Sequence, residues 1–210
     1  MKKLVIFLLI FILLFSSCSK QPKELDFSDI NDMNIGAEMP KVLYADQNKA
    51  IFFGCFGIIV YDLENRTITD RVYKEFEEIF KEKTYYDCDA SADGRYIYVS
   101  YLDFSFEEKY DGYYHVYDTE TVRFKNKHLD YDEAEIFENT YVSLFDCDES
   151  EKYFPYLDDV ILGHGMSETI AETEYGFVAL RSDTWNAKDL QIAVCNYETE
   201  KVEIFDLFDL

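Results

Sequence analysis

Three nine-residue stretches repeat one pattern: VYDLENRTI at residues 60–68, VYDTETVRF at residues 116–124 and VCNYETEKV at residues 194–202. Each has an apolar strand end, an Asp or Asn, a polar turn centred on Glu, and a returning apolar residue. Asp, Asn and Thr side chains can hydrogen-bond to the backbone of their own turn. Each stretch therefore predicts a β-hairpin.

Outward from these hairpins, the chain from residue 41 onward consists of short runs rich in Val, Ile, Phe and Tyr between turn signals. Such runs are typical of strands. They lie at residues 42–44, 50–53, 57–61, 96–99, 113–117, 176–180 and 190–194. One segment differs, because Val72, Phe76, Ile79 and Phe80 recur at helical spacing and predict one short amphipathic helix within residues 71–82.

A second element, SADGRYIYV at residues 91–99, resembles the strand-turn-strand motif of bacterial β-propellers of the YVTN and TolB type, with Ala92 in the place of the usual proline. The resemblance implies an all-β, antiparallel, propeller-like fold of three or four blade-like sheets, possibly incomplete. The hairpin copies are 56 and 78 residues apart, from Asp62 to Asp118 and from Asp118 to Asn196. A usual blade spans roughly 40–50 residues. We therefore consider a degenerate fourth sheet around residues 141–159, with a β-sandwich as the alternative fold.

The N-terminus has the pattern of an export signal. Lys2 and Lys3 precede an apolar run at residues 4–15, which is shorter than the roughly 20 residues of a membrane span. The sequence LFSSC at residues 14–18 resembles the lipobox of bacterial lipoproteins, which implies cleavage before Cys18 and lipid attachment to that cysteine. We expect residues 1–17 to be a signal peptide, 18–40 a lipidated N-terminus and polar tether, and 41–210 a β-rich domain. The protein is then held on the extracytoplasmic face of the cell membrane by its N-terminal lipid.

Composition limits the partners. The formal net charge is −23, and 43 acidic residues face 20 basic ones. Because such a chain repels phosphates, and no basic patch is evident, nucleic acid is not an expected partner. With 48% hydrophobic and 18% aromatic residues, the chain has ample material for a folded core.

Candidate chemical sites are few. The sequence leaves open whether Cys55, Cys88, Cys147 and Cys195 form disulfides. The acidic loop from Asp87 to Gly94 spaces oxygen ligands as calcium loops do, but Ser100 stands where such loops carry a bidentate Glu, so a solvated hairpin turn is the preferred interpretation.

His164 lies in a Gly-His-Gly segment without the spacing of a nucleophile elbow. No catalytic residue, cofactor or metal site is assigned from the sequence. The excess of Tyr, including Tyr113 and Tyr114, predicts sheet packing or a sugar- or peptide-binding face. We therefore expect a binding or accessory module with an unidentified cell-envelope or extracellular ligand. The alternative is a cell-envelope hydrolase that uses acidic residues.

Overall fold

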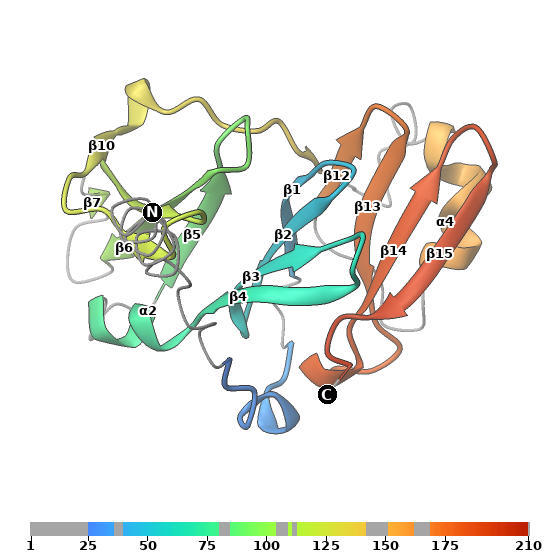
Figure 1. Ribbon diagram of the computed structural model, residues 1–210, viewed down its shortest axis with the longest axis horizontal. Coiled ribbons are helices and arrows are strands. Elements are labelled where there is room, and N and C mark those ends of the chain that lie inside the picture. The colour runs from blue at the N-terminus through green and yellow to red at the C-terminus, as the bar shows by residue number, and fades with distance from the viewer. Residues whose placement is uncertain are drawn as a thin grey trace, which may run out of the picture.

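The computed structural model describes residues 25–35, 40–79, 85–103, 109–110, 113–141, 151–161 and 169–209. These residues form three antiparallel sheets that lie side by side, with few helices (Figure 1). The predicted all-β class is confirmed. There is one sheet more than a two-sheet sandwich would have.

Sheet 1 is a four-stranded meander in chain order, β1-β2-β3-β4. Its strands are β1 (Lys41–Ala45), β2 (Lys49–Gly54), β3 (Gly57–Asp62) and β4 (Thr67–Val72). β3 is buried along most of its length, because sheet 1 lies between the other two sheets. Helix α2 (Lys74–Ile79) follows β4 and falls within the range predicted for the amphipathic helix.

Sheet 2 has the order β10-β8-β6-β5, with β7 paired to β6 and β9 paired to β8. Its strands are β5 (Tyr85–Ala90), β6 (Tyr96–Asp103), β7 (Lys109–Tyr110), β8 (Tyr113–Asp118), β9 (Arg123–Phe124) and β10 (Leu129–Asp130). A short 3-10 helix, η3 (Tyr131–Glu133), follows β10.

Sheet 3 has the order β11-β12-β13-β14-β15. Its strands are β11 (Thr140–Tyr141), β12 (Thr169–Thr173), β13 (Gly176–Arg181), β14 (Gln191–Asn196) and β15 (Lys201–Asp206). The remaining elements are η2 (Ile30–Asp32), η4 (Glu151–Tyr153), α4 (Phe154–Val160) and η5 (Ala187–Asp189).

The three repeated stretches form the predicted hairpins, and their turns share one backbone conformation. Asp62, Asp118 and Asn196 each accept a hydrogen bond from the backbone N–H three residues later, at distances between 2.8 and 3.2 Å. The seventh residue of each stretch has a positive φ, namely +53° at Arg66, +55° at Val122 and +52° at Glu200. The repeat is therefore a repeat of structure.

Two apolar interfaces hold the sheets together. One joins sheets 1 and 3 through side chains such as Phe52 and Leu180, and the other joins sheets 1 and 2 through side chains such as Ile58 and Val99, all fully buried. Burial of each such side chain contributes roughly 1.5–3 kcal/mol relative to its exposed state. Sheet 1 thus has both faces covered, whereas sheets 2 and 3 each have one outer face.

The predicted fourth sheet is wrong where the structure describes it. Residues 151–160 are helical and form η4 and α4. Tyr153, Tyr156 and Val160 are buried at the spacing of a helical face, and Pro155 stands in the first turn, where its missing N–H costs nothing. Residues 142–150 of that range lie outside the described residues.

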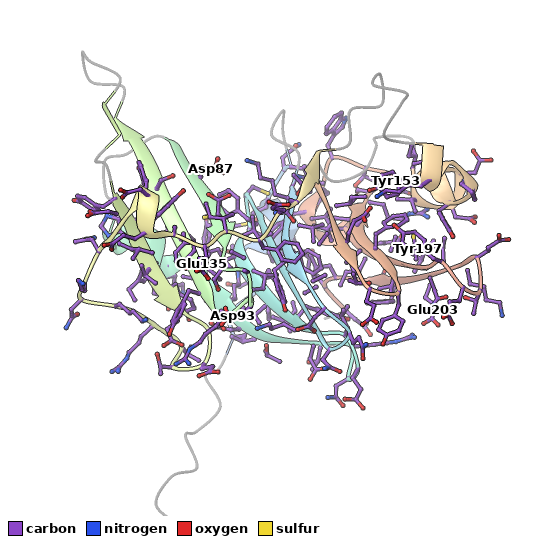
Figure 2. The ribbon with its side chains drawn as sticks, turned by 90° about the horizontal axis from the view of Figure 1, so that it is seen from above. Asp87, Asp93, Glu135, Tyr153, Tyr197 and Glu203 are labelled. Carbon is purple, nitrogen blue, oxygen red and sulfur yellow. The ribbon has the colours of Figure 1, made fainter. Side chains whose placement is uncertain are left out.

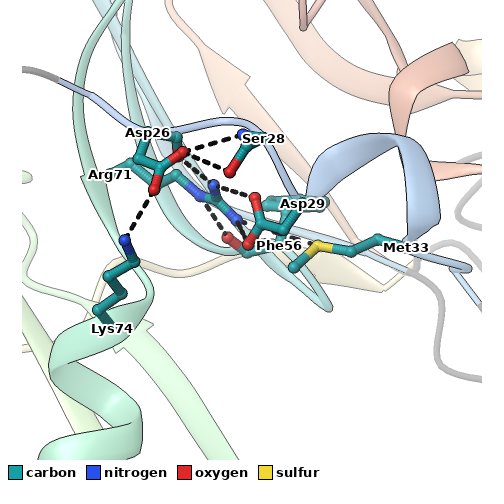
Figure 3. A network of polar contacts seen from close by, with 7 residues as sticks. All are labelled: Asp26, Ser28, Asp29, Met33, Phe56, Arg71 and Lys74. Atoms are coloured by element: carbon teal, nitrogen blue, oxygen red, sulfur yellow. Dashed lines mark hydrogen bonds and ion pairs between the residues drawn. The ribbon is translucent and has the colours of Figure 1, made fainter.

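Residues 25–35, here called the strap, belong to the predicted tether of residues 18–40 and pack against the domain. Ile30 is fully buried, and Phe27 meets Phe208 edge to face. Figure 3 shows how Arg71 of β4 holds the strap through an ion pair with Asp29 at 2.7 Å, while it donates to the Phe56 carbonyl at 3.2 Å. Composition alone predicts a tether for this segment, because its few apolar side chains lack periodicity.

Candidate functional site

Several residues considered from the sequence lie outside the described residues. These are Cys18, Cys147, His164 and the whole of the predicted signal peptide. Among the helices that the structure describes, none is both long and apolar enough to cross a membrane.

Of the described cysteines, Cys88 and Cys195 are free thiols. Cys55 is exposed, whereas Cys88 and Cys195 are buried. Burial raises the pKa of Cys88 well above the ordinary value and raises that of Cys195 to about 12. Both buried thiols therefore stay protonated and unreactive at neutral pH.

The acidic loop from Asp87 to Gly94 is the end of β5 and a hairpin turn. Asp87 forms an ion pair with Lys41 at 2.9 Å, while Asp93 accepts from the Ser91 hydroxyl at 2.6 Å and from the Arg95 N–H at 3.0 Å. Among the described residues, no three His, Cys, Asp or Glu side chains are placed to hold a metal ion. The turn favours glycine at position 94, because φ there is +64° and a Cβ at this position would collide with the Tyr44 ring.

One cavity lies on the outer face of sheet 2, beneath a segment that we call the arch (residues 129–137). The arch begins beside β8, where Leu129 pairs with Tyr114. It ends beyond β5, where the Phe137 N–H donates to the Ala90 carbonyl at 2.8 Å and Ile136 forms a bridge with Ser91. The chain therefore crosses the whole width of the sheet.

The arch pocket has a volume of about 420 Å³, which is within the range of roughly 300–1,000 Å³ for small-molecule sites. Tyr96, Tyr98 and Val116 supply its floor, and Leu129 lines it from the arch. These side chains lie on the outer face because β6 and β8 turn alternate residues, such as Ile97, toward sheet 1. The floor is therefore aromatic and apolar.

The walls of the arch pocket are charged. Lys125, Lys127 and His128 line it from the segment beyond β8. The Lys125 ammonium lies 3.7 Å from the centre of the Tyr96 ring, a close cation–π contact. The His128 ring packs against Tyr113 at 4.3 Å between ring centres.

Acidic groups also line the arch pocket: Asp93 from the turn after β5, and Glu133 and Glu135 from the arch. Figure 2 shows Asp93 and Glu135 on the sheet 2 side of the molecule, toward its middle. The hydrogen bond from Ser91 lowers the pKa of Asp93, so this carboxyl is ionised at neutral pH. All three carboxylates are exposed.

A second cavity of about 240 Å³ lies between sheets 1 and 3 and is lined in part by Arg66, Glu203 and Phe205. Arg66 forms an ion pair with Glu203 at 2.7 Å and stacks over Phe205 at 5.0 Å. The Arg66 guanidinium therefore already has an ion-pair partner within the chain. The arch pocket is larger, so we take it as the candidate site.

Among the described residues, the carboxyls at and near the arch pocket bear on the hydrolase alternative. A general acid needs a raised pKa, and burial raises the pKa of Asp89, which also receives a hydrogen bond from Tyr114 at 3.4 Å. However, Asp89 does not line the arch pocket. The carboxyls that do line it are exposed, and Asp93 has a lowered pKa.

Comparison with known proteins adds no assignment: no family model, no curated protein and no solved structure matches the chain. The site therefore rests on geometry. Sequence reasoning placed Tyr113 and Tyr114 near a possible binding face but missed the charged walls. A signal existed, because Lys125, Lys127 and His128 form a basic cluster within a chain of net charge −23.

Proposed function

We propose that this protein is a membrane-anchored extracytoplasmic lipoprotein that acts as a binding module, with the arch pocket as its ligand site. The observation that supports this proposal best is the combination within one cavity of an aromatic floor and charged walls. Small-ligand sites typically have a mostly apolar lining with a few placed polar groups.

The anchor that we propose is lipid on Cys18, and the docked strap limits the distance between this lipid and the domain. Seven residue steps separate Cys18 from Leu25, the first described residue. At roughly 3.3–3.6 Å for each extended residue, these steps span at most about 25 Å. The domain would then be held close to the membrane, with the strap side toward the lipid.

For the fold we propose an open, propeller-like arrangement of three blade-like sheets. Each sheet is an antiparallel meander, largely in chain order. Early strands of the sheets meet at the centre, since β1 contacts both β12 and β5. This is how the inner strands of propeller blades are arranged.

Metabolic labelling tests the anchor. The full-length chain is expressed in a bacterium grown with an alkyne-bearing palmitate, and the protein is then coupled to a fluorophore. We expect label on the wild type and on Cys55→Ser, the exposed-cysteine control, and none on Cys18→Ser. A wild-type chain without label would contradict the proposed anchor.

Calorimetric titration of the full-length chain in detergent micelles with soluble cell-envelope fragments, both glycan and peptide, tests the binding module. We expect at least one fragment to bind and Tyr96→Ala to weaken that binding at least tenfold, because the ring forms the pocket floor. Absence of binding across the panel would contradict the proposal.

A further inference from the structure

We propose that the arch pocket binds a short peptide of about three residues that has a free amino end and a free carboxyl end. This inference rests on the proposed binding function and names its ligand class. It follows from how sheet 2 separates the two charged walls of the pocket.

The cationic wall lies at one margin of the sheet. The Lys125 N–H donates to the Val116 carbonyl at 2.8 Å, and Leu129 pairs with Tyr114. Residues 125–129 therefore run along the outer side of β8, and Lys127 belongs to this run. The cations thus enter the pocket from the β8 side.

The acidic wall lies at the opposite margin. The Glu135 carbonyl accepts from the Ala92 N–H at 3.0 Å, and Ser91 pairs with Ile136. Both contacts place this part of the arch just beyond the end of β5. Asp93 belongs to the turn that follows β5, so it adds to the same side.

The charges of the two walls are unpaired. Among the described residues, neither Lys125 nor Lys127 has a carboxylate within ion-pair distance, and neither Glu133 nor Glu135 has a cation within that distance. In a chain with more than twice as many acidic as basic residues, two neighbouring lysines without a carboxylate partner are unexpected. Residues 125–129 and Glu135 lie at opposite margins of the sheet, so the charges of the lysines and of Glu135 remain available to a ligand that carries both charges.

The width of the site sets the length of the ligand. From the Lys127 run to the Glu135 run there are four strand spacings, across β8, β6 and β5, or about 19 Å at ~4.8 Å each. Lysine and glutamate side chains project into this width from both walls. The remaining gap suits about three extended residues at ~3.4 Å each.

The chemistry of each part matches a peptide with free ends. A terminal carboxylate is recognised by the ammonium groups of Lys125 and Lys127, and a terminal amine by the carboxylates of Glu133 and Glu135. Charge-assisted hydrogen bonds of this kind are roughly twice as strong as neutral ones. The apolar floor suits an uncharged aliphatic side chain at the middle residue.

The probe is the tripeptide Ala-Leu-Ala, titrated calorimetrically into the full-length chain in detergent micelles. Its N-acetylated and C-amidated forms remove one terminal charge each. We expect the free peptide to bind and each capped form to bind at least tenfold more weakly. Equal affinity of the free and capped peptides would overturn the proposal.

Variants assign each end to its wall. With Lys125→Ala and Lys127→Ala together, the free peptide should bind only as well as the C-amide does, and the C-amide should be unaffected. With Glu133→Gln and Glu135→Gln together, the free peptide should bind only as well as the N-acetylated peptide does, and binding of the N-acetylated peptide should be unaffected. Lys188→Ala, an exposed lysine outside the pocket, is the control and should keep wild-type affinity. All these side chains are exposed, so each variant should keep the wild-type unfolding midpoint. Loss of affinity without this end-specific pattern would contradict the assignment.

Titration with a neutral disaccharide, chitobiose, distinguishes failure of the peptide assignment from failure of the proposed binding function. Binding of chitobiose at the pocket without binding of the tripeptide would leave a binding module but overturn the peptide assignment. Failure of both ligands, and of the wider panel of envelope fragments, would count against both.

Discussion

Tyrosine rings pack on the outer faces of both sheet 2 and sheet 3, yet among the described residues only the face of sheet 3 is covered by helices η4 and α4. We call this covered face the closed face and the outer face of sheet 2 the open face. On sheet 3, Tyr153 and Tyr156 pack edge to face on Phe177, at 5.1 and 5.6 Å between ring centres, and η4 and α4 cover the face. On sheet 2, the arch touches the face through Tyr131, whose ring lies 4.5 Å from that of Tyr114, and a cavity remains beside this contact. Figure 2 shows Tyr153 and Tyr197 on the sheet 3 side of the molecule and Asp93 and Glu135 on the sheet 2 side.

The direction of the carboxyl pKa shift also differs between the two faces. On the closed face, burial opposes the charge of Glu172, but hydrogen bonds from Lys152 and Tyr153 outweigh it and lower its pKa. On the open face, burial raises the pKa of Asp89. Helices with their own polar partners therefore cover the outer face of sheet 3, whereas the arch, a single segment of chain, leaves a cavity and charges without ion-pair partners on sheet 2.

The largest expected effect is the loss of Phe177. Phe177→Ala removes a fully buried ring from the centre of the closed face and should lower the free energy of unfolding by about 3–5 kcal/mol, measured by urea denaturation. Tyr131→Ala on the arch removes a half-buried ring and should cost about 1–2 kcal/mol. Equal losses would mean that the arch packs as tightly as the helix does.

Glu172→Gln should lower the free energy of unfolding by about 1 kcal/mol at pH 7, because it removes a partly solvent-screened charge that Lys152 and Tyr153 stabilise. Since the pKa of Glu172 is lower in the folded state than in the unfolded one, this contribution is complete above the unfolded value near 4.5. It is lost as the pH falls through the folded value. Urea titrations at several pH values should show the two proteins converging in acid.

Asp89→Asn should act in the opposite direction and raise the free energy of unfolding by about 1 kcal/mol at pH 7, because it removes a charge that burial disfavours. The pKa of Asp89 is raised in the folded state, so the wild type loses stability as the pH rises from the unfolded value near 3.8 through the folded value. The advantage of the variant should therefore vanish below about pH 3.8. A destabilised variant at pH 7 would show that Asp89 has a favourable charged partner.

The smallest effect concerns the repeated turns of the same two sheets. Val122→Gly should raise the free energy of unfolding by about 0.5–1 kcal/mol, because a β-branched residue is strained at a φ of +55° and Val122 is more than one-third exposed. Glu200→Gly, at the matching position of sheet 3, should gain less, since Glu is not β-branched. Thermal unfolding of the pair measures the difference, and a larger gain for Glu200→Gly would contradict this explanation.

Local sequence predicted the strands and hairpins well, because Asp62, Asp118 and Asn196 act on their own turns. The positive φ at Val122 left no such signal, since no glycine marks it. Nor could the closed face be foreseen, because η4 and α4 are short and the helical spacing of Tyr153, Tyr156 and Val160 becomes meaningful only once Phe177 lies beneath them.

The arch pocket depends on contacts over long distances in the chain, and these explain why its charged walls could not be predicted. Glu135 reaches the acidic margin through its bond to Ala92, 43 residues earlier. Lys125 reaches the Tyr96 ring across β8. The basic cluster at residues 125–128 is visible in the sequence because its members are close in the chain. That the acidic residues line the same cavity is visible only from the order of the strands in sheet 2.

The most direct test of the difference between the two faces is reductive methylation of lysines in the full-length chain, read by mass spectrometry with and without Ala-Leu-Ala. We predict that the peptide slows modification of Lys125 and Lys127 on the open face, and leaves Lys152 on the closed face and Lys188 unchanged. Unchanged modification of Lys125 and Lys127 at a saturating peptide concentration, or equal protection of Lys152, would contradict the account.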